Sequence, residues 1–264
     1  MFVRFVYAAV KIILNLLYKS TVFRHDNMKF CLVFLTIFFE SVIINAQDTI
    51  NRSDVEGKKN GHWIKKDNEG KKIYDGQFSH GLPVGEFRYY YPEGQLKAIS
   101  VLSENGTRSR TTTFFKNGKK MAEGLYINEK KDSLWKFYSE YEDEVVSEEF
   151  YKDGKKEGVA KTFYPDGIVA ERLTWKNGVR SGLWEQYYTD GKLKLKCTYK
   201  NDQKDGPLKT YHMSGKIWLT GQYINGDADG TWIYITDKGE IEKKEYYEKG
   251  KLLKTEEFIK KETK

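Results

Sequence analysis

Cysteine, proline and histidine are scarce in this chain of 264 residues, which contains two, four and four of them, respectively. Two cysteines, Cys31 and Cys197, are too few for a disulfide framework or a zinc ribbon. Four scattered histidines offer little material for a metal centre or for histidine-dependent catalysis. Few prolines, together with 23 glycines, fit neither collagen nor a disordered chain. We therefore expect no cofactor and no metal site.

A clustered charge of one sign is also missing. The chain has 45 Lys and Arg against 38 Asp and Glu, and the two signs alternate along most of its length. A nucleic-acid interface needs a clustered basic stripe, so we expect no nucleic-acid partner. Aromatic residues, in contrast, make up 15% of the chain, which is typical of a β-rich protein stabilised by ring packing.

Signs of an active site are equally sparse. No serine or cysteine stands in a strand–turn–helix elbow, and no pair of carboxylates is set apart from the rest. Asn225–Gly230 resembles the start of an EF-hand loop, but Thr236 occupies the twelfth position, where that loop needs a bidentate glutamate. The sequence favours a protein that is not an enzyme.

The amino-terminal segment differs from all that follows. Residues 28–46 combine a short positive start, an apolar run and a final small residue, Ala46, which is typical of a secretory signal peptide. We expect export to the periplasm, the cell surface or the medium. An uncleaved segment would instead anchor the protein in a membrane, although Phe30–Phe39 is short for a membrane span. Residues 1–27 are then an upstream extension from a misassigned start at Met1 instead of Met28.

Glycine recurs at a fixed interval over most of the chain. One series has members 24 residues apart with a single step of 25, and Ser109 and Ser133 hold two of its places. A large apolar residue, often Trp, follows two residues later, and a pair of aromatic residues follows after five or six. The repeat residues that we expect to be structural are Gly61, Trp63, Gly85, Gly158, Gly182, Trp184, Gly206, Gly230 and Trp232. Glycines and aromatic residues that recur with the same interval and at fixed distances from one another indicate tandem structural repeats.

Each repeat unit has the pattern of a β-hairpin. After Gly191, the apolar residues Leu193, Leu195, Cys197 and Tyr199 alternate with lysine and threonine, as in a strand with one buried face. Asp-Gly and Asn-Gly pairs stand between such stretches and favour tight hairpin turns, because glycine tolerates positive φ. A 24-residue unit is therefore two antiparallel strands and two turns, which gives about sixteen strands in total.

The unit G-x-W-x-x-Y-Y-x-(D/N)-G-x-L resembles the MORN repeat, in the variant found in bacterial proteins of the YwqK-type antitoxin-component family. The resemblance covers residues 57–255 and is weakest in residues 105–150, where Thr111 replaces Trp and Tyr141–Glu144 replace the Asn-Gly turn. It implies an elongated sheet of stacked hairpins that serves as an interaction scaffold. It also implies membrane attachment, lipid binding or self-association as functions of the family.

These observations define the predicted fold as all-β. We expect an elongated single-layer antiparallel β-meander of about eight 24-residue MORN-type hairpin repeats, after an N-terminal signal or anchor helix. The predicted divisions are an upstream extension (1–27), a signal peptide or anchor (28–46), a linker (47–56), the repeats (57–255) and a charged tail (256–264). We call the glycines of the 24-residue series the first-series glycines, and we expect them to let a neighbouring aromatic ring lie over the backbone.

The predicted function is protein–protein scaffolding, with another protein or a second copy of the chain as the partner. One alternative is binding of cell-surface glycan or anionic lipid head groups through rows of aromatic and lysine side chains. Another is an antitoxin-like role against a toxin protein. The predicted binding surface consists of the outward tyrosines and one lysine row, namely Tyr90, Tyr164, Tyr187, Lys192, Lys194 and Lys196.

Overall fold

The computed structural model describes residues 50–259. The predicted upstream extension and the signal or anchor helix lie outside the described residues, as does most of the predicted tail. No helix among residues 50–259 is long and apolar enough to cross a membrane.

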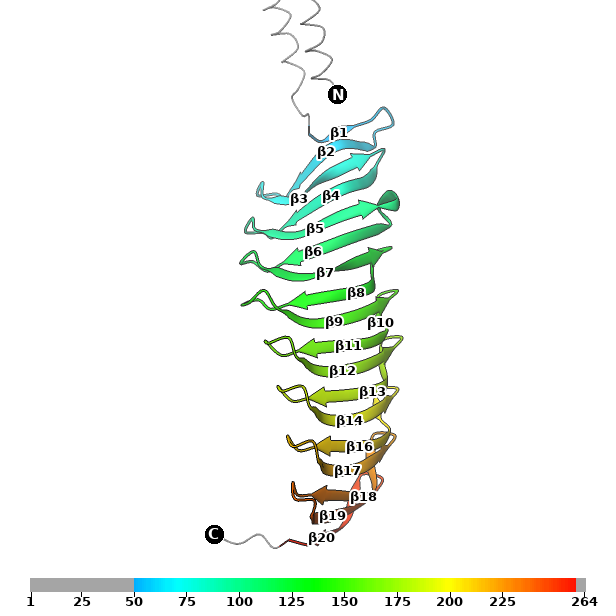
Figure 1. The fold of residues 1–264 in the computed structure, drawn as a ribbon. Helices are drawn as coiled ribbons and strands as arrows, with labels where there is room; N and C mark the ends of the chain where they lie inside the picture. Colours follow the sequence, from blue (N-terminus) through cyan, green and yellow to red (C-terminus); the bar gives the residue numbers. More distant parts are fainter. Residues whose placement is uncertain (1–49, 260–264) are drawn as a thin grey trace, which may run out of the picture. The chain divides into compact units, whose positions relative to one another are not determined.

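The described residues form one antiparallel sheet of twenty strands and a single 3-10 turn, η1. The strands run in chain order, and each pairs with its neighbours along the sequence. Figure 1 shows them stacked one after another with hairpin turns at both sides. The elements are β1 (Arg52–Ser53), β2 (Lys59–Lys66), β3 (Lys72–Ser79), β4 (Leu82–Tyr90), β5 (Leu96–Ser103), η1 (Glu104–Gly106), β6 (Arg108–Phe114), β7 (Lys120–Ile127), β8 (Lys130–Tyr138), β9 (Val145–Lys152), β10 (Lys155–Lys156), β11 (Gly158–Phe163), β12 (Val169–Lys176), β13 (Val179–Tyr187), β14 (Leu193–Lys200), β15 (Gln203–Lys204), β16 (Gly206–Tyr211), β17 (Ile217–Ile224), β18 (Asp227–Ile235), β19 (Ile241–Glu248) and β20 (Lys251–Glu257). The predicted all-β single-sheet meander is confirmed, and the number of repeats stays a prediction.

The sheet has more strands than the sequence predicts for two reasons. Pairing is interrupted before Gly158 and Gly206, whose φ angles are +79° and +102°, so one strand is divided into β10 and β11 and another into β15 and β16. In addition, β1 falls within residues 47–56, which the sequence predicts to be a linker, and β20 extends into the predicted tail that starts at residue 256.

The turns follow the predicted chemistry. At one end of the strands Gly191 donates its backbone N–H to the carbonyl of Tyr188 over 2.9 Å, which closes the Thr-Asp-Gly turn between β13 and β14. At the other end Asn177 and Gly178 both have positive φ, 52° and 86°, as a two-residue hairpin turn requires. The Gly178 N–H reaches back to the carbonyl of Lys156 over 2.9 Å and so joins this turn to the preceding unit.

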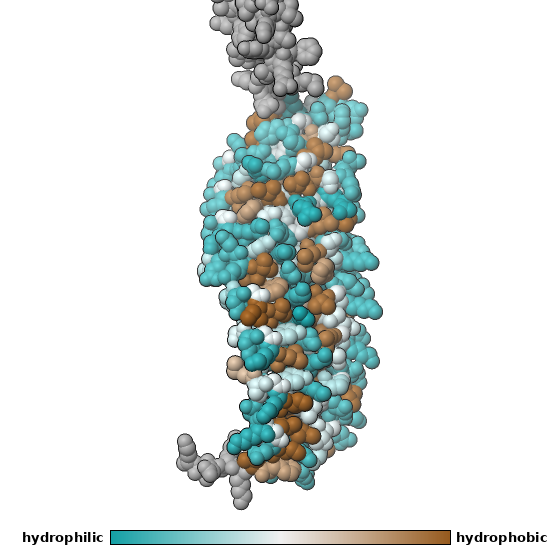
Figure 2. Space-filling view, viewed as in Figure 1, coloured by the Kyte–Doolittle hydropathy of each residue, from teal (hydrophilic) through white to brown (hydrophobic). Residues whose placement is uncertain are grey.

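The core lies on one face of the sheet, which we call the aromatic face because it carries Trp63, Phe87, Trp135, Trp184 and Trp232. Figure 2 shows an interrupted apolar column between polar flanks on the visible side of the molecule. Trp184, Leu195 and Tyr199 point to the aromatic face together with buried Cys197, as the alternation predicts. The buried side chains of residues 50–259 all point to this face and are Phe87, Ser100, Thr111, Ala122, Trp135, Cys197, Leu208, Thr210, Trp232 and Glu245.

The packing role predicted for the first-series glycines is wrong. No atom lies within 4 Å of the place where a Cβ would stand on Gly61, Gly85 or Gly158. Their φ angles are +81°, +68° and +79°, so these glycines are required by the backbone conformation and not by a ring.

The glycines that accommodate rings are a different set. A Cβ on Gly76 would lie 2.4 Å from the ring of Phe87, and one on Gly124 would lie 2.3 Å from the ring of Trp135. Gly221 stands in the same relation to Trp232 at 2.4 Å. Each of these glycines lies on the strand before its aromatic residue, so the ring packs directly on the neighbouring backbone.

Candidate binding surface

The three tyrosines predicted to form one outward row do not occupy equivalent positions. Tyr90 and Tyr187 are the last residues of β4 and β13, whereas Tyr164 follows the end of β11. The ring of Tyr90 lies 5.1 Å from Lys72 Nζ, and the ring of Tyr187 lies 5.5 Å from the guanidinium of Arg172.

Tyr164 belongs to a row that joins successive turns. Its hydroxyl donates a hydrogen bond to the carbonyl of Tyr187 over 2.7 Å. The hydroxyl of Tyr188 donates to the carbonyl of Tyr211 over 2.6 Å, and that of Tyr91 donates to the carbonyl of Phe114 over 2.8 Å. In these three units the second residue of the aromatic pair therefore links a turn to the next unit, and the Tyr164 hydroxyl is already engaged in a hydrogen bond.

Tyr187 and the predicted lysines lie on the opposite face, which we call the charged face because Glu123, Glu185, Lys196 and Lys209 point from it. The Tyr187 hydroxyl donates to Glu185 over 2.8 Å, and burial, followed by this hydrogen bond, raises the tyrosine pKa. Lys196 lies 3.5 Å from the other carboxylate oxygen of Glu185, so Tyr187 and Lys196 share one carboxylate.

The other two lysines of the predicted row are also exposed. Lys192 stands in the turn before β14, 2.8 Å from Asp190, and Lys194 lies 5.7 Å from the ring of Tyr188. Exposed ion pairs of this kind contribute little stability, so these cations are free to exchange partners.

The aromatic face carries an arrangement that the sequence interpretation missed. Cross-strand pairing places one ring beside one cation at the end of four successive hairpins: Tyr126 faces Lys131, Tyr151 faces Lys156, Trp175 faces Arg180 and Tyr199 faces Lys204. Each cation also lies over the ring of the next hairpin. We call the resulting alternating row the ladder, and its members are Tyr126, Lys131, Tyr151, Lys156, Trp175, Arg180, Tyr199, Lys204 and Tyr223.

The contacts from one hairpin to the next are of similar length along the whole ladder. The cation-to-ring distances are 5.1 Å for Lys131 over Tyr151, 4.8 Å for Lys156 over Trp175, 4.6 Å for Arg180 over Tyr199 and 5.0 Å for Lys204 over Tyr223. These lie within the range in which a ring quadrupole attracts a cation. The repeat period therefore fixes both the rings and the cations at regular intervals.

The charge of the ladder is only partly neutralised. Lys156 is paired with Glu149 at 2.7 Å, and Arg180 is paired with Asp202 at 2.9 Å. Among residues 50–259, no carboxylate lies within 4 Å of Lys131 or Lys204. Burial lowers the pKa of Lys131; the charge of Glu149 opposes this effect, and the nearby Lys156 adds to it. The ladder therefore presents a half-buried positive row.

A signal for the ladder was present in the sequence. A basic residue stands at 131, 156, 180 and 204, four positions before Trp135, Ala160, Trp184 and Leu208. An aromatic residue is the last but one of β7, β9, β12, β14 and β17. The spacing was visible, but the pairing of the two series across the strands depends on the register of the sheet.

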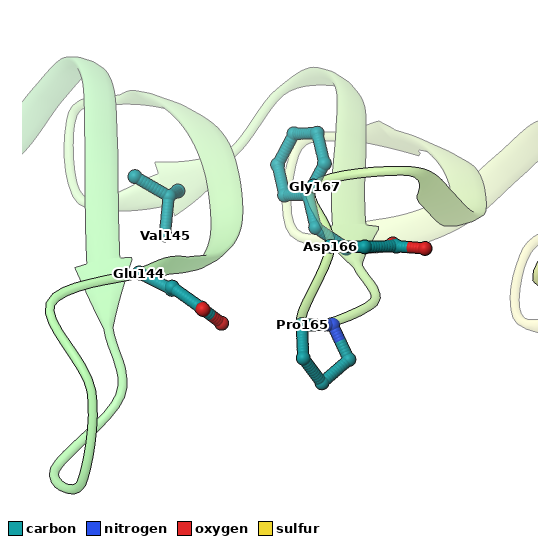
Figure 3. A pocket seen from close by; sticks show the side chains of 6 residues that line it. Glu144, Val145, Pro165, Asp166 and Gly167 are labelled. Atoms are coloured by element: carbon teal, nitrogen blue, oxygen red, sulfur yellow. The ribbon is translucent and has the colours of Figure 1, made fainter.

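A shallow hollow of about 330 Å³ lies between two turns at the ends of β8 and β11 (Figure 3). Its lining residues are Glu144, Val145, Phe163, Pro165, Asp166 and Gly167. Burial raises the pKa of Glu144, and the charges of Glu142 and Asp166 raise it further. With two carboxylates and no basic side chain in its lining, the hollow gives no reason to assign it a ligand. In the part of the chain that is described, no group of three or more His, Cys, Asp or Glu side chains is placed to hold a metal ion.

Similarity to known structures is distant. Two structures of S. aureus TarM, one of them a mutant in complex with fondaparinux, alpha-GlcNAc-glycerol and UDP, are 12% identical over 54% of this chain, with a TM-score of 0.28. The Photorhabdus luminescens Tc holotoxin pore is 13% identical over 74% of this chain, with a TM-score of 0.20. The chain spans 24% of TarM and 12% of the holotoxin chain. At these TM-scores neither likeness bears on the fold or on the function.

Similarity to a sequence family is more specific. No curated protein matches the chain. The model of the MORN repeat variant family matches four segments, residues 83–101, 156–177, 180–201 and 239–260. The narrower resemblance to YwqK-type antitoxin components stays a prediction. The sheet is therefore built, at least in these four segments, from MORN repeat variant units.

Proposed function

We propose that this chain is a non-enzymatic, exported repeat protein that serves as a scaffold for protein–protein interaction. The observation that carries the proposal is the ladder, a half-buried row of regularly spaced rings and cations on a sheet that is a single layer in residues 50–259. MORN repeats generally bind proteins or lipids, which agrees with a binding role for the four matched segments.

The proposed mechanism is complementarity along a stiff array. Backbone pairing between consecutive hairpins fixes the distance between equivalent side chains, and ring packing on Gly124 and Gly221 resists deformation of the sheet. Charge on the ladder then selects the partner, because electrostatic complementarity contributes more to specificity than to affinity.

The export part of the proposal rests on residues 28–46 alone. Cells expressing the full chain with a C-terminal tag would be fractionated, and the amino terminus of the tagged product would be sequenced. An amino terminus directly after Ala46 in the exported fraction supports export with cleavage. Recovery of the intact chain from the cytoplasm contradicts it.

The scaffold part is tested by capture of partners from cells. The tagged full chain is cross-linked in vivo, and co-purified material is identified by mass spectrometry for the wild type and for two double variants. One variant, K131Q with K204Q, removes ladder cations, and the other, K194Q with K196Q, removes the same charge from the charged face. A single protein, or a second copy of the chain, that is enriched with wild type and lost with one variant supports scaffolding.

The alternative of lipid or glycan binding is favoured by the exposed lysines of the charged face, Lys192, Lys194 and Lys196. Vesicles containing anionic lipid, and purified cell-surface polysaccharide, are therefore offered to the same proteins. Binding that needs Lys194, Lys196 and the ring of Tyr187, without any captured protein, contradicts scaffolding and supports the alternative.

A further inference from the structure

The period of the ladder matches the period of one kind of peptide. Neighbouring strands are about 4.8 Å apart, so cations two strands apart recur about every 9.6 Å along the sheet. A polyproline II helix rises about 3.1 Å per residue with three residues per turn, so the same side of the peptide recurs about every 9.3 Å. Over the three intervals from Lys131 to Lys204 the accumulated mismatch is about 1 Å, which side chains can absorb.

Other regular conformations lose register over the same distance. Two turns of an α-helix advance about 10.8 Å, so the mismatch after three intervals is about 3.6 Å. An extended strand presents the same side about every 6.7 Å. The residue three positions along would lie near the next cation, but its side chain points away from the ladder. A polyproline II peptide is therefore the regular peptide whose repeat follows that of the hairpins.

The chemistry of the ladder defines the residues of that peptide. Proline-rich segments pack on aromatic side chains that line a groove, and here Tyr151, Trp175 and Tyr199 supply the rings. Lys131 and Lys204 have no carboxylate within 4 Å among the described residues, so acidic side chains on the ligand would form ion pairs with these two cations. The peptide is thus proline-rich, and a carboxylate on every third residue places one opposite both Lys131 and Lys204, whereas Lys156 and Arg180 already have carboxylate partners in the chain.

We propose that the ladder binds an extended acidic, proline-rich segment of a partner protein in the polyproline II conformation, one turn of the segment per hairpin. This inference rests on the proposed scaffold function and specifies the face and the partner. The burial of the cations favours a single chain over a membrane surface. Lys156 and Arg180 are 31% and 38% exposed, whereas a planar bilayer would first meet the exposed Lys194, Lys196 and Lys209 of the charged face.

The test measures binding of labelled synthetic peptides to the full chain by fluorescence anisotropy at low and physiological salt. The first peptide consists of Pro-Pro-Glu triplets and is long enough to span the four ladder cations. The second has the same composition with its glutamates gathered at one end, and the third replaces every glutamate with lysine. We expect the first peptide to bind about tenfold more tightly than the second, and the third not to bind.

Variants of the protein assign the binding to the ladder. We expect K131Q with K204Q to weaken binding of the triplet peptide about tenfold, whereas K194Q with K196Q leaves it unchanged. Lys204→Arg should retain binding, because Arg180 already occupies an equivalent place with the same ring contact. Circular dichroism reports whether each variant keeps its sheet, and the comparison of peptides on the wild-type chain needs no variant.

The outcomes distinguish failure of the inference from failure of the proposed function. Equal affinity for the triplet and end-loaded peptides, loss of binding in the charged-face variant, or no binding at all overturns the inference. In those cases a protein captured from cells still supports scaffolding through another surface. Binding of anionic vesicles or polysaccharide alone overturns both the inference and the proposed function.

Discussion

At the scale of single residues, the sheet depends on places where a ring lies directly on glycine. The indole of Trp135 occupies the space above Gly124, and Trp135 is only 1% exposed. Gly85, in contrast, has open space around its missing Cβ and owes its identity to a φ of +68°. Replacing Gly124 or Gly85 is therefore expected to destabilise the protein for different reasons.

We expect Gly124→Ala to destabilise the protein by about 3 kcal/mol, because the methyl group displaces a buried indole that has no free volume to enter. Gly85→Ala should cost about 1 kcal/mol from backbone strain alone. Urea denaturation followed by tryptophan fluorescence measures both. Equal losses in the two variants would show that ring contact contributes nothing beyond glycine's conformational freedom.

A second residue-scale prediction concerns alkaline pH. Burial, together with a hydrogen bond donated to Glu123, raises the pKa of Tyr138 to about 12. An unfolded tyrosine titrates near pH 10, so between about pH 10 and pH 12 the folded chain retains a proton that the unfolded chain has lost. The stabilising contribution of Tyr138 is complete below pH 10 and is lost as the pH rises through this window.

We therefore expect the wild-type melting temperature to fall between pH 10 and pH 12 and to fall less in Tyr138→Phe, which has no hydroxyl to titrate. Tyr141→Phe is the matched control, because that ring is 83% exposed. Melting curves recorded by circular dichroism across this range measure the effect. Identical pH profiles for wild type and Tyr138→Phe would contradict the assignment.

The sequence was least informative about packing contacts, in particular about which glycines have a ring packed on them. Gly61, Gly85 and Gly158 recur at a fixed interval. The sequence does not show whether such a glycine is required by a positive φ or by a ring that packs where its side chain would stand. Gly76, Gly124 and Gly221 recur less regularly, because Ser100, Leu173 and Cys197 take the corresponding places in other units. Only the cross-strand register separates the two kinds of glycine.

At the scale of the elements, each hairpin is tied to the next by more than strand pairing. Tyr91, Tyr164 and Tyr188 each donate a hydroxyl hydrogen bond to a carbonyl 23 residues further along the chain. His212 lies in the same place, with its Nε2 2.8 Å from the carbonyl of Ile235. These bonds fasten the turns at one end of the strands to one another.

We expect Tyr164→Phe to cost about 1 kcal/mol, because the carbonyl of Tyr187 loses its donor while the ring stays in place. Amide hydrogen exchange should become faster in the turn between β13 and β14 and stay unchanged in β4 and β5. Amide exchange at the wild-type rate in the turn between β13 and β14 would mean that the Tyr164 hydroxyl plays no part in joining the turns.

Strands and turns were the elements best predicted from the sequence. Alternation after Gly191 and the Asn177-Gly178 pair specify local geometry, and both are confirmed. The division of two strands before Gly158 and Gly206 was not predicted, because the interruption arises from pairing with the neighbouring hairpin.

At the scale of the whole sheet, the candidate site follows from register. The sequence interpretation grouped Tyr90, Tyr164 and Tyr187 because each belongs to an aromatic pair, but one residue of offset puts Tyr164 in the turn. The ladder was not predicted because its rings and cations come from different strands and become neighbours only after pairing. Whether ligands use the ladder or the charged face is the question that the peptide and variant measurements decide.

The same connectivity limits how far a disturbance travels. Within residues 50–259, each hairpin pairs only with its neighbours along the sheet, so stability is approximately a sum of local and nearest-neighbour contributions. Trp135 of β8 is buried against β7 and pairs with β9, and Trp232 is buried in β18, ten strands further along the numbering of the sheet. Replacing either one therefore creates a cavity at a known place.

We expect Trp135→Ala to cost about 4 kcal/mol locally and to speed amide exchange in β6 to β9, with β18 and β19 protected as in the wild type. Trp232→Ala should give the reverse pattern, so the two variants control for each other. Hydrogen exchange monitored by mass spectrometry resolves β6 to β9 from β18 and β19. Faster exchange in both regions in either variant would show that the sheet unfolds as one cooperative unit, which contradicts a stability made of local and nearest-neighbour contributions.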